Sequence, residues 1–239
     1  MQNQQPSTLK EIRVHGTQDF PCAFYQTGTR IKGNMVKHHW HEEVELLYFS
    51  GGEFCLEVNM ERFNISEECF YVINPGELHS ISVEKNGGCV ENAVVFHMDM
   101  LSSAYALDQI QTNLIQPVQN GSIQFPRCLR KNEPAFEPVR KSYEEIRNVF
   151  GGDSFRENYY DGEAVTDDIT RQLFIKSALL RILAVLSANN LFEVTEKNHD
   201  HRIETIKTTL TYIQENYKEK IYIRDLAGLI GMNEQYFCR

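Results

Sequence analysis

The stretch GNMVKHHWHEEVELLYFSGG, residues 33–52, decides the fold. Five of its residues are spaced as follows: Gly33, five residues, His39, one residue, His41, three residues, Glu45, six residues, Gly52. His39 and His41 are two residues apart, so their side chains share one face of a strand. Glu45 has the same parity, but on a straight strand it would lie roughly 13 Å beyond His41, at about 3.3 Å per residue. We therefore predict two strands joined by a bend that brings the three side chains together.

The flanking segments, from Ile12 to about Met98, are short and alternate in hydrophobicity. FCLEVN (54–59) and RFNIS (62–66) each place alternate apolar residues on one face, and the link between them is short enough for a hairpin. The Pro-Gly turn in NPGELH (74–79) can direct His79 into the pocket of the other ligands. Many short strands at close spacing predict an antiparallel sandwich or barrel. We assign residues 1–138 to this domain, irregular after Gln116 except for a short strand near residues 122–125.

Helical patterns replace the strands from Val139 onward. VRKSYEEIRNVF (139–150) is predicted to be a helix that ends at the glycines 151 and 152. A second helix follows Thr166, the predicted N-cap, with two aspartates at its positive end. This helix is apolar on more than one face, so it must be buried on two sides. The second contact is either the core of the same monomer or a second subunit, and we assign residues 139–195 to a helical dimerisation segment.

The C-terminal part begins after a polar linker, EKNHD (196–200). HRIETIKTTLTYIQENY (201–217) is predicted to be a helix, IRDLAGLIG (223–231) a shorter one that stops at Gly231, and EQYFCR the start of another after Asn233, a good N-cap. Residues 200–239 carry six basic and six acidic side chains, and the 239-residue chain has a net charge of −9. A nucleic-acid function must therefore rest on a motif and not on bulk charge.

The remaining composition points to a protein of the cytoplasm. The N-terminus lacks the apolar segment of a signal peptide, and the chain has no run of about 18 apolar residues that would cross a membrane. The six scattered cysteines contain no CxxC pair and are expected to be reduced thiols that pack in the core.

Three imidazoles and a carboxylate form a ligand set for a divalent transition metal such as Zn, Ni, Fe or Mn. His39, His41, Glu45 and His79 are the predicted effector-binding or metal-ligating residues. Two alternatives remain open: a metal-free pocket in which the same groups hydrogen-bond an organic effector, or histidines that lie by chance on a solvated edge.

The spacing of residues 33–52 resembles cupin motif one, G-x5-H-x-H-x3-E-x6-G, at every marked position. The second cupin motif, G-x5-P-x-G-x2-H-x3-N, is half matched. Gly76 and His79 fit, whereas Glu68 replaces the leading glycine, the proline is displaced to Pro75 and Val83 replaces the final asparagine. The resemblance implies a cupin barrel in which all four metal positions carry ligand-capable residues.

IYIRDLAGLIGMNEQYFCR (221–239) resembles the start of the DNA-binding domain of AraC-type regulators. A helix with a Leu-Ala pair, a Gly-Met turn, a polar cap and a Tyr-Phe pair follow in that family's order. The resemblance implies an α+β protein with an N-terminal cupin-like antiparallel barrel, then helices, then an incomplete helix-turn-helix over residues 200–239. The DNA-binding residues that it implies are Asn233, Glu234, Gln235, Tyr236 and Arg239. Because the chain stops inside the first recognition helix, we expect it to bind operator DNA weakly or not at all.

The resemblance further implies a non-enzymatic regulator, a homodimer without membrane attachment, that binds a small polar metabolite such as a carbohydrate. The rival from another class is a metal-dependent cupin enzyme, a dioxygenase or sugar isomerase, which would have no need of the C-terminal motif. A dimerisation module with a vestigial pocket is the third alternative.

Overall fold

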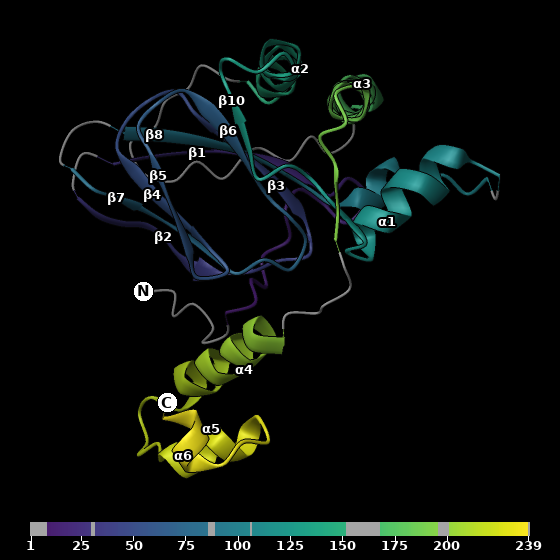
Figure 1. Cartoon of the computed structure of the whole chain (residues 1–239). Helices are drawn as coiled ribbons and strands as arrows, with labels where there is room; N and C mark the ends of the chain where they lie inside the picture. Colours follow the sequence, from purple (N-terminus) through teal and green to yellow (C-terminus); the bar gives the residue numbers. More distant parts are fainter. Residues whose placement is uncertain are drawn as a thin grey trace.

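The computed structural model describes residues 9–29, 32–85, 89–105, 107–151, 168–195 and 201–238. Within these residues, two antiparallel sheets of five and four strands face each other as an open barrel (Figure 1). The five-stranded sheet has the order β1 (Cys22–Thr29), β8 (Cys89–Phe96), β3 (Val44–Phe49), β6 (Cys69–Ile73), β10 (Cys128–Arg130). The four-stranded sheet has the order β2 (Gly33–His39), β7 (His79–Val83), β4 (Phe54–Val58), β5 (Glu61–Ile65). The predicted cupin-like barrel is confirmed.

The predicted bend after His41 is present, and it changes sheet as well as direction. β2 ends at His39 in the four-stranded sheet, and β3 begins at Val44 in the five-stranded sheet. The predicted hairpin between β4 and β5 also forms. Its two turn residues, Asn59 and Met60, have φ angles of 49° and 69°, which suit the two-residue turns that match strand twist.

Helices and short elements follow the barrel in chain order. They are the 3-10 helix η1 (Met98–Leu101), the π-helix η2 (Gln111–Ile115), α1 (Gln116–Gln119), β9 (Ile123–Gln124), α2 (Phe136–Val149), α3 (Ile169–Ala188), β11 (Glu193–Val194), α4 (His201–Asn216), α5 (Ile223–Leu229) and α6 (Glu234–Phe237). No described helix is long and apolar enough to span a bilayer. The cysteines with described side chains, Cys22, Cys55, Cys69, Cys128 and Cys238, are free thiols.

The structure corrects three details of the helical region. The segment after Gln116, expected to be irregular, begins with a helix that continues from η2. α2 begins at Phe136, three residues before the predicted start, because Phe136 is fully buried under the sheet. The side chain of Asp168 caps α3 by accepting from two backbone amides, a role we had predicted for Thr166. Thr166, like Gly152, the 196–200 linker and Arg239, lies outside the described residues.

Two apolar cores cover the two faces of the five-stranded sheet. One fills the barrel between the sheets, and the other packs the outer face of the five-stranded sheet against α2 and α3. In α3 the buried face includes Ile175, Ile182 and Leu186, while Leu173 is 63% exposed. The helix thus has an apolar stripe that this monomer leaves uncovered, and its burial in a dimer stays a prediction.

The C-terminal helices have the predicted helix-turn-helix pattern. Leu226 and Ala227 of α5 are buried, Gly231 turns the chain at a φ of 68°, and the side chain of Asn233 accepts from the backbone amide of Tyr236 at 2.8 Å. Asn233 therefore caps α6 as predicted.

Candidate metal and effector site

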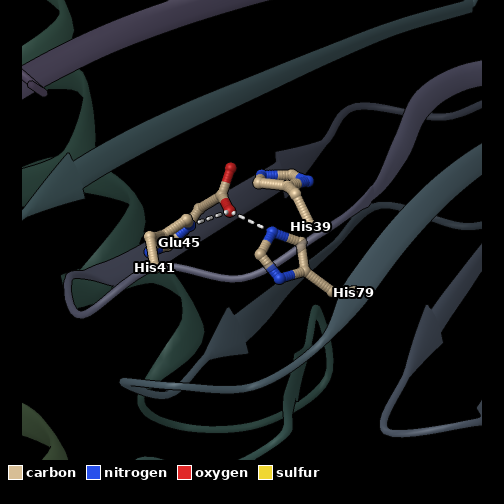
Figure 2. A group of neighbouring side chains, drawn as sticks. All are labelled: His39, His41, Glu45 and His79. Atoms are coloured by element: carbon tan, nitrogen blue, oxygen red, sulfur yellow. Dashed lines mark hydrogen bonds and ion pairs between the residues drawn. The ribbon is translucent and has the colours of Figure 1, made fainter. Parts of the chain in front are cut away.

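Four side chains, three of them within seven residues and the fourth on a later strand, lie close together (Figure 2). His39 ends β2, His41 lies in the bend, Glu45 is on β3, and His79 begins β7 directly opposite His39. Each offers one ligand atom, and these atoms all lie within 4.8 Å of one another. His41 is 3% exposed and His79 1% exposed. The structure thus brings all four predicted residues together; we call them the four-residue cluster.

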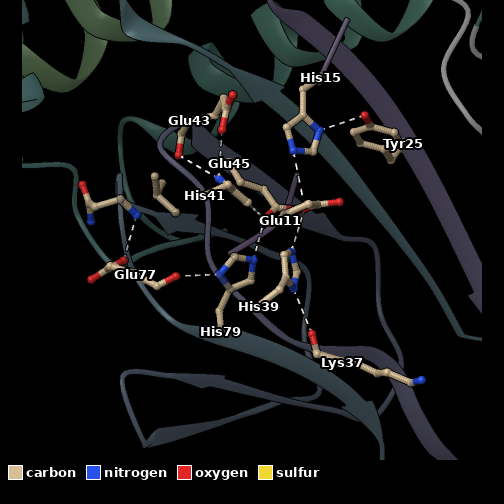
Figure 3. A network of polar contacts seen from close by, with 12 residues as sticks. Glu11, His15, Tyr25, Lys37, His39, His41, Glu43, Glu45, Glu77 and His79 are labelled. Carbon is tan, nitrogen blue, oxygen red and sulfur yellow. Dashed lines mark hydrogen bonds and ion pairs between the residues drawn. The ribbon is translucent and has the colours of Figure 1, made fainter. Parts of the chain in front are cut away.

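Backbone carbonyl groups orient the three imidazoles of the cluster (Figure 3). Each Nδ1 lies near a carbonyl oxygen two residues away: His39 and Lys37 at 2.9 Å, His41 and Glu43 at 3.2 Å, His79 and Glu77 at 2.9 Å. A carbonyl can only accept, so Nδ1 carries the hydrogen in each neutral ring and the lone pair lies on Nε2. Such outer contacts are the ones that fix metal-ligating histidines.

The Nε2 atoms converge on carboxylate oxygens rather than on donors. Glu45 Oε2 lies 3.3 Å from His41 Nε2 and 3.0 Å from His79 Nε2. His79 Nε2 is buried with no hydrogen-bond partner among the described residues. The lone pairs of these nitrogens and of the carboxylate oxygen face one another and repel. A cation or a proton between them would remove this repulsion. This orphaned nitrogen is the feature that fits a metal.

The protonation of the cluster follows from burial and from Glu45. Burial, helped by the charge of His79, lowers the pKa of His39 to about 4. Burial also opposes the charged form of His41, but the hydrogen bond and charge of Glu45 outweigh it and raise its pKa. Burial likewise disfavours the Glu45 carboxylate, yet its contacts with His41 and His79 hold its pKa well below the usual value. The cluster therefore presents an anionic carboxylate and a neutral His39 at neutral pH, and a metal would displace the proton that Glu45 favours on His41.

The donor set of three imidazole nitrogens and one carboxylate oxygen suits Zn, Ni, Fe or Mn. When bound, such an ion supplies a Lewis-acid charge to which a polar ligand can bind. His39, His41, Glu45 and His79 would hold it.

The turn at residues 74–77 sets the position of His79, and the sequence indicated only its Pro-Gly pair. Gly76, with a φ of 78°, follows Pro75, and the Glu77 amide donates to the Asn74 carbonyl at 3.1 Å. The buried Glu77 carboxylate accepts from the Asn74 amide at 2.7 Å and from Arg127 Nη1 at 2.6 Å. Sequence analysis missed Glu77 and Arg127, since they are 50 residues apart and only the fold pairs them.

Two further polar residues, also missed, extend the site from the N-terminal segment. Glu11 Oε2 lies 3.3 Å from His39 Nε2, and the buried His15 lies beside His41 with 5.3 Å between ring centroids (Figure 3). Glu11, His15 and His41 form a second group whose ligand atoms lie within 4.8 Å of one another. No motif spacing links residues 11 and 15 to residue 39, so the sequence held no signal for them.

Trp40, between the two histidines in sequence, forms the contact with the C-terminal part. Lys10 Nζ lies 4.7 Å and Lys207 Nζ 4.6 Å from the centroid of its ring. Lys207 is the one side chain of α4 that is buried among those the structure describes. Helix α4 therefore contacts the barrel domain at Trp40, and Figure 1 shows this helix below the barrel.

The predicted DNA-binding residues lie at a different place from the cluster. Glu234, Gln235 and Tyr236 are exposed on α6, with Tyr236 63% exposed. Figure 1 places α5 and α6 beyond α4, away from the barrel. The four-residue cluster and the predicted DNA-binding residues are thus separate, with α4 between them.

Comparison with known proteins gives one family and several more distant relatives. The AraC-like ligand binding domain matches residues 27–148, just over half of the chain and all four residues of the cluster. The uncharacterized HTH-type transcriptional regulator YdeC of Bacillus subtilis is 25% identical, over 97% of this chain and 74% of that protein. Among solved structures, ToxT from Vibrio cholerae is 9% identical with a TM-score of 0.39, over 93% of this chain and 73% of that chain. A predicted oxalate decarboxylase from Thermotoga maritima is 24% identical with a TM-score of 0.29, over 31% of this chain and 64% of that chain.

Proposed function

Because the chain belongs to the AraC family through its AraC-like ligand-binding domain, we propose that the barrel senses an effector for a transcriptional regulator at the four-residue cluster. The observation that carries this proposal is the convergence of His39, His41, Glu45 and His79, whose ligand atoms lie within 4.8 Å of one another. Oriented lone pairs around an orphaned nitrogen favour a divalent transition metal as the resident group. The effector would then bind to that metal.

The packing of the barrel favours a small effector. Apolar side chains fill its interior, and Leu47, Phe49 and Leu56 are fully buried there. We therefore place the effector at the mouth, beside the cluster, rather than deep in the barrel. A carbohydrate or another small polar metabolite, held through its hydroxyl or carboxylate oxygens, is the class that we propose.

Signal transfer to DNA would pass through α4. A ligand at His39 and His41 acts on the segment that carries Trp40, and Trp40 contacts Lys207. Two arrangements of this contact, one favoured by the ligand, would shift the position of α5 and α6. We propose operator DNA as the partner of α6, in a cytoplasmic homodimer, and expect a polypeptide of these 239 residues to bind it weakly in a gel-shift assay.

Elemental analysis of the purified chain and of its Glu45→Gln variant tests the resident metal. We expect about one equivalent of Zn, Ni, Fe or Mn in the parent and a large loss in the variant. A thermal-shift screen of sugars, nucleosides and small organic acids then tests the effector, with stabilisation by one class in the parent alone as the expected result. Turnover of such a compound, or oxygen consumption with bound Fe or Mn, would instead support the metal-dependent cupin enzyme. A parent without metal and without any shift would refute the proposal.

A further inference from the structure

The N-terminal segment is fixed beside the four-residue cluster by its backbone. Leu9 is 2% exposed, and its carbonyl accepts from the Trp40 amide at 3.0 Å. The Glu11 amide donates to the Trp40 carbonyl at 2.9 Å, so residues 9–11 run parallel to the chain at Trp40, in an isolated bridge just after β2. Lys10 Nζ adds an ion pair with Glu42 at 2.9 Å. The two backbone hydrogen bonds with Trp40, rather than the exposed Lys10–Glu42 pair, aim the Glu11 side chain at the cluster.

The Glu11 carboxylate faces a lone pair instead of a donor. Glu11 Oε2 lies 3.3 Å from His39 Nε2, while His39 Nδ1 is held by the Lys37 carbonyl. In the tautomer that this carbonyl fixes, Nε2 carries no hydrogen, so two electron-rich atoms face each other. A cation between them would turn this repulsion into two coordination bonds.

His15 gives an independent indication of a missing partner. Its side chain is 4% exposed, and its Nε2 has no hydrogen-bond partner among the described residues, although it lies 3.5 Å from Glu11 Oε2. Its Nδ1 is occupied by the Tyr25 hydroxyl at 2.8 Å. This buried nitrogen is directed at Glu11. It can hold the Glu11 carboxylate in place when that carboxylate also binds a cation.

The four-residue cluster and the group of Glu11, His15 and His41 share a residue and can hold one metal ion between them, not two. Both include His41, and the His41 Nδ1 is occupied by the Glu43 carbonyl. The single lone pair on Nε2 can bind only one metal ion. Glu11 is therefore an additional ligand to the ion of the four-residue cluster and not part of a second metal site.

We propose that Glu11 is a fifth protein ligand to the metal, supplied by the N-terminal segment, and that residues 9–15 are held more firmly against the barrel when metal is bound. This inference rests on the proposed function, because it requires a metal at the cluster. It adds a ligand outside the barrel motif, positioned by His15 and by the backbone pairing with Trp40.

Metal titrations of the full chain test this inference. Zn²⁺ and Co²⁺ binding would be measured by calorimetry and by the visible absorption of Co²⁺ for the parent and for Glu11→Gln, which keeps the shape but loses the charge. Glu42→Gln is the matched control, since it removes a neighbouring exposed carboxylate whose ion pair among the described residues is with Lys10. We expect Glu11→Gln to bind about 10- to 100-fold more weakly with a changed Co²⁺ spectrum, and Glu42→Gln to behave as the parent.

Amide hydrogen exchange provides a readout that does not depend on affinity. Saturating Zn²⁺ should slow exchange of residues 9–15 in the parent but not in Glu11→Gln, with circular dichroism of the apo proteins confirming that both are folded. If both proteins bind metal with equal affinity, spectrum and protection, Glu11 is not a ligand and the proposed metal site stands. If the parent binds neither ion, the metal site and this inference both fail.

Discussion

Replacing Glu77 by alanine should destabilise the barrel by about 3 kcal/mol. The carboxylate is 7% exposed and accepts from the Asn74 amide and from both terminal nitrogens of Arg127. Removing one partner of a buried ion pair costs about 3–5 kcal/mol, because the other charge is left without compensation. Arg127 is 26% exposed and regains part of its hydration, so the lower end of this range applies.

The same substitution should weaken metal binding, since Glu77 holds the turn whose carbonyl orients His79. Urea unfolding followed by circular dichroism gives the stability, and calorimetry with Zn²⁺ gives an expected loss of about 10- to 100-fold in affinity. Glu53→Gln is the control, because Glu53 pairs with Lys85 at 2.6 Å in an exposed ion pair worth less than about 1 kcal/mol. A loss in Glu77→Ala no larger than in this control would refute the reasoning.

Three further predictions concern other parts of the chain. Burial, and then the charge of Glu45, hold the pKa of Glu91 well above its usual value. The folded state therefore keeps a proton that the unfolded state releases above a pH of about 4.3. Glu91→Gln should have the larger free energy of unfolding at neutral pH, and its advantage over the parent should shrink on acidification. An advantage that does not change with pH would contradict this. Leu173→Glu on the exposed stripe of α3 should turn a dimer into a monomer in light scattering, since two leucines buried at about 1.5–3 kcal/mol each imply at least about a 100-fold higher Kd; a parent that is monomeric at high concentration would rule this out. A hydrogen bond from Cys69 lowers the pKa of Cys128 to about 7, so alkylation by iodoacetamide should rise with a midpoint near pH 7, and Cys128→Ser should lack this phase.

The sequence predicted the cluster because its chemistry is local. The histidines at 39 and 41 and the carboxylate at 45 lie within seven residues, and parity with one bend is enough to bring them together. His79 needed only a Pro-Gly turn to reach them. The helix-turn-helix was found for the same reason, because Gly231 and Asn233 are turn and cap residues that act on their immediate neighbours.

The supporting residues could not be predicted because their partners are distant in sequence. Arg127 and Glu77 are 50 positions apart in the sequence. Glu11 reaches the cluster through backbone hydrogen bonds with Trp40, and such bonds produce no pattern of hydrophobic residues in the sequence. The helix at 111–119 was missed because Pro117 and the following glycine resemble a loop, whereas Pro117 lies where the π-helix η2 passes into α1. Hydrophobic periodicity in the sequence therefore predicted helices and strands. Polar pairs between residues distant in sequence became apparent only in the folded structure.

Trp40 is the single tryptophan of the chain, and it lies between the two histidines under the ammonium groups of Lys10 and Lys207. The tryptophan fluorescence of the protein therefore comes from a point where the four-residue cluster, the N-terminal segment and helix α4 meet. The emission maximum and quantum yield should respond separately to metal at the cluster and to removal of the lysine on α4. The protein thus carries its own optical reporter of whether the barrel and the C-terminal helices are docked.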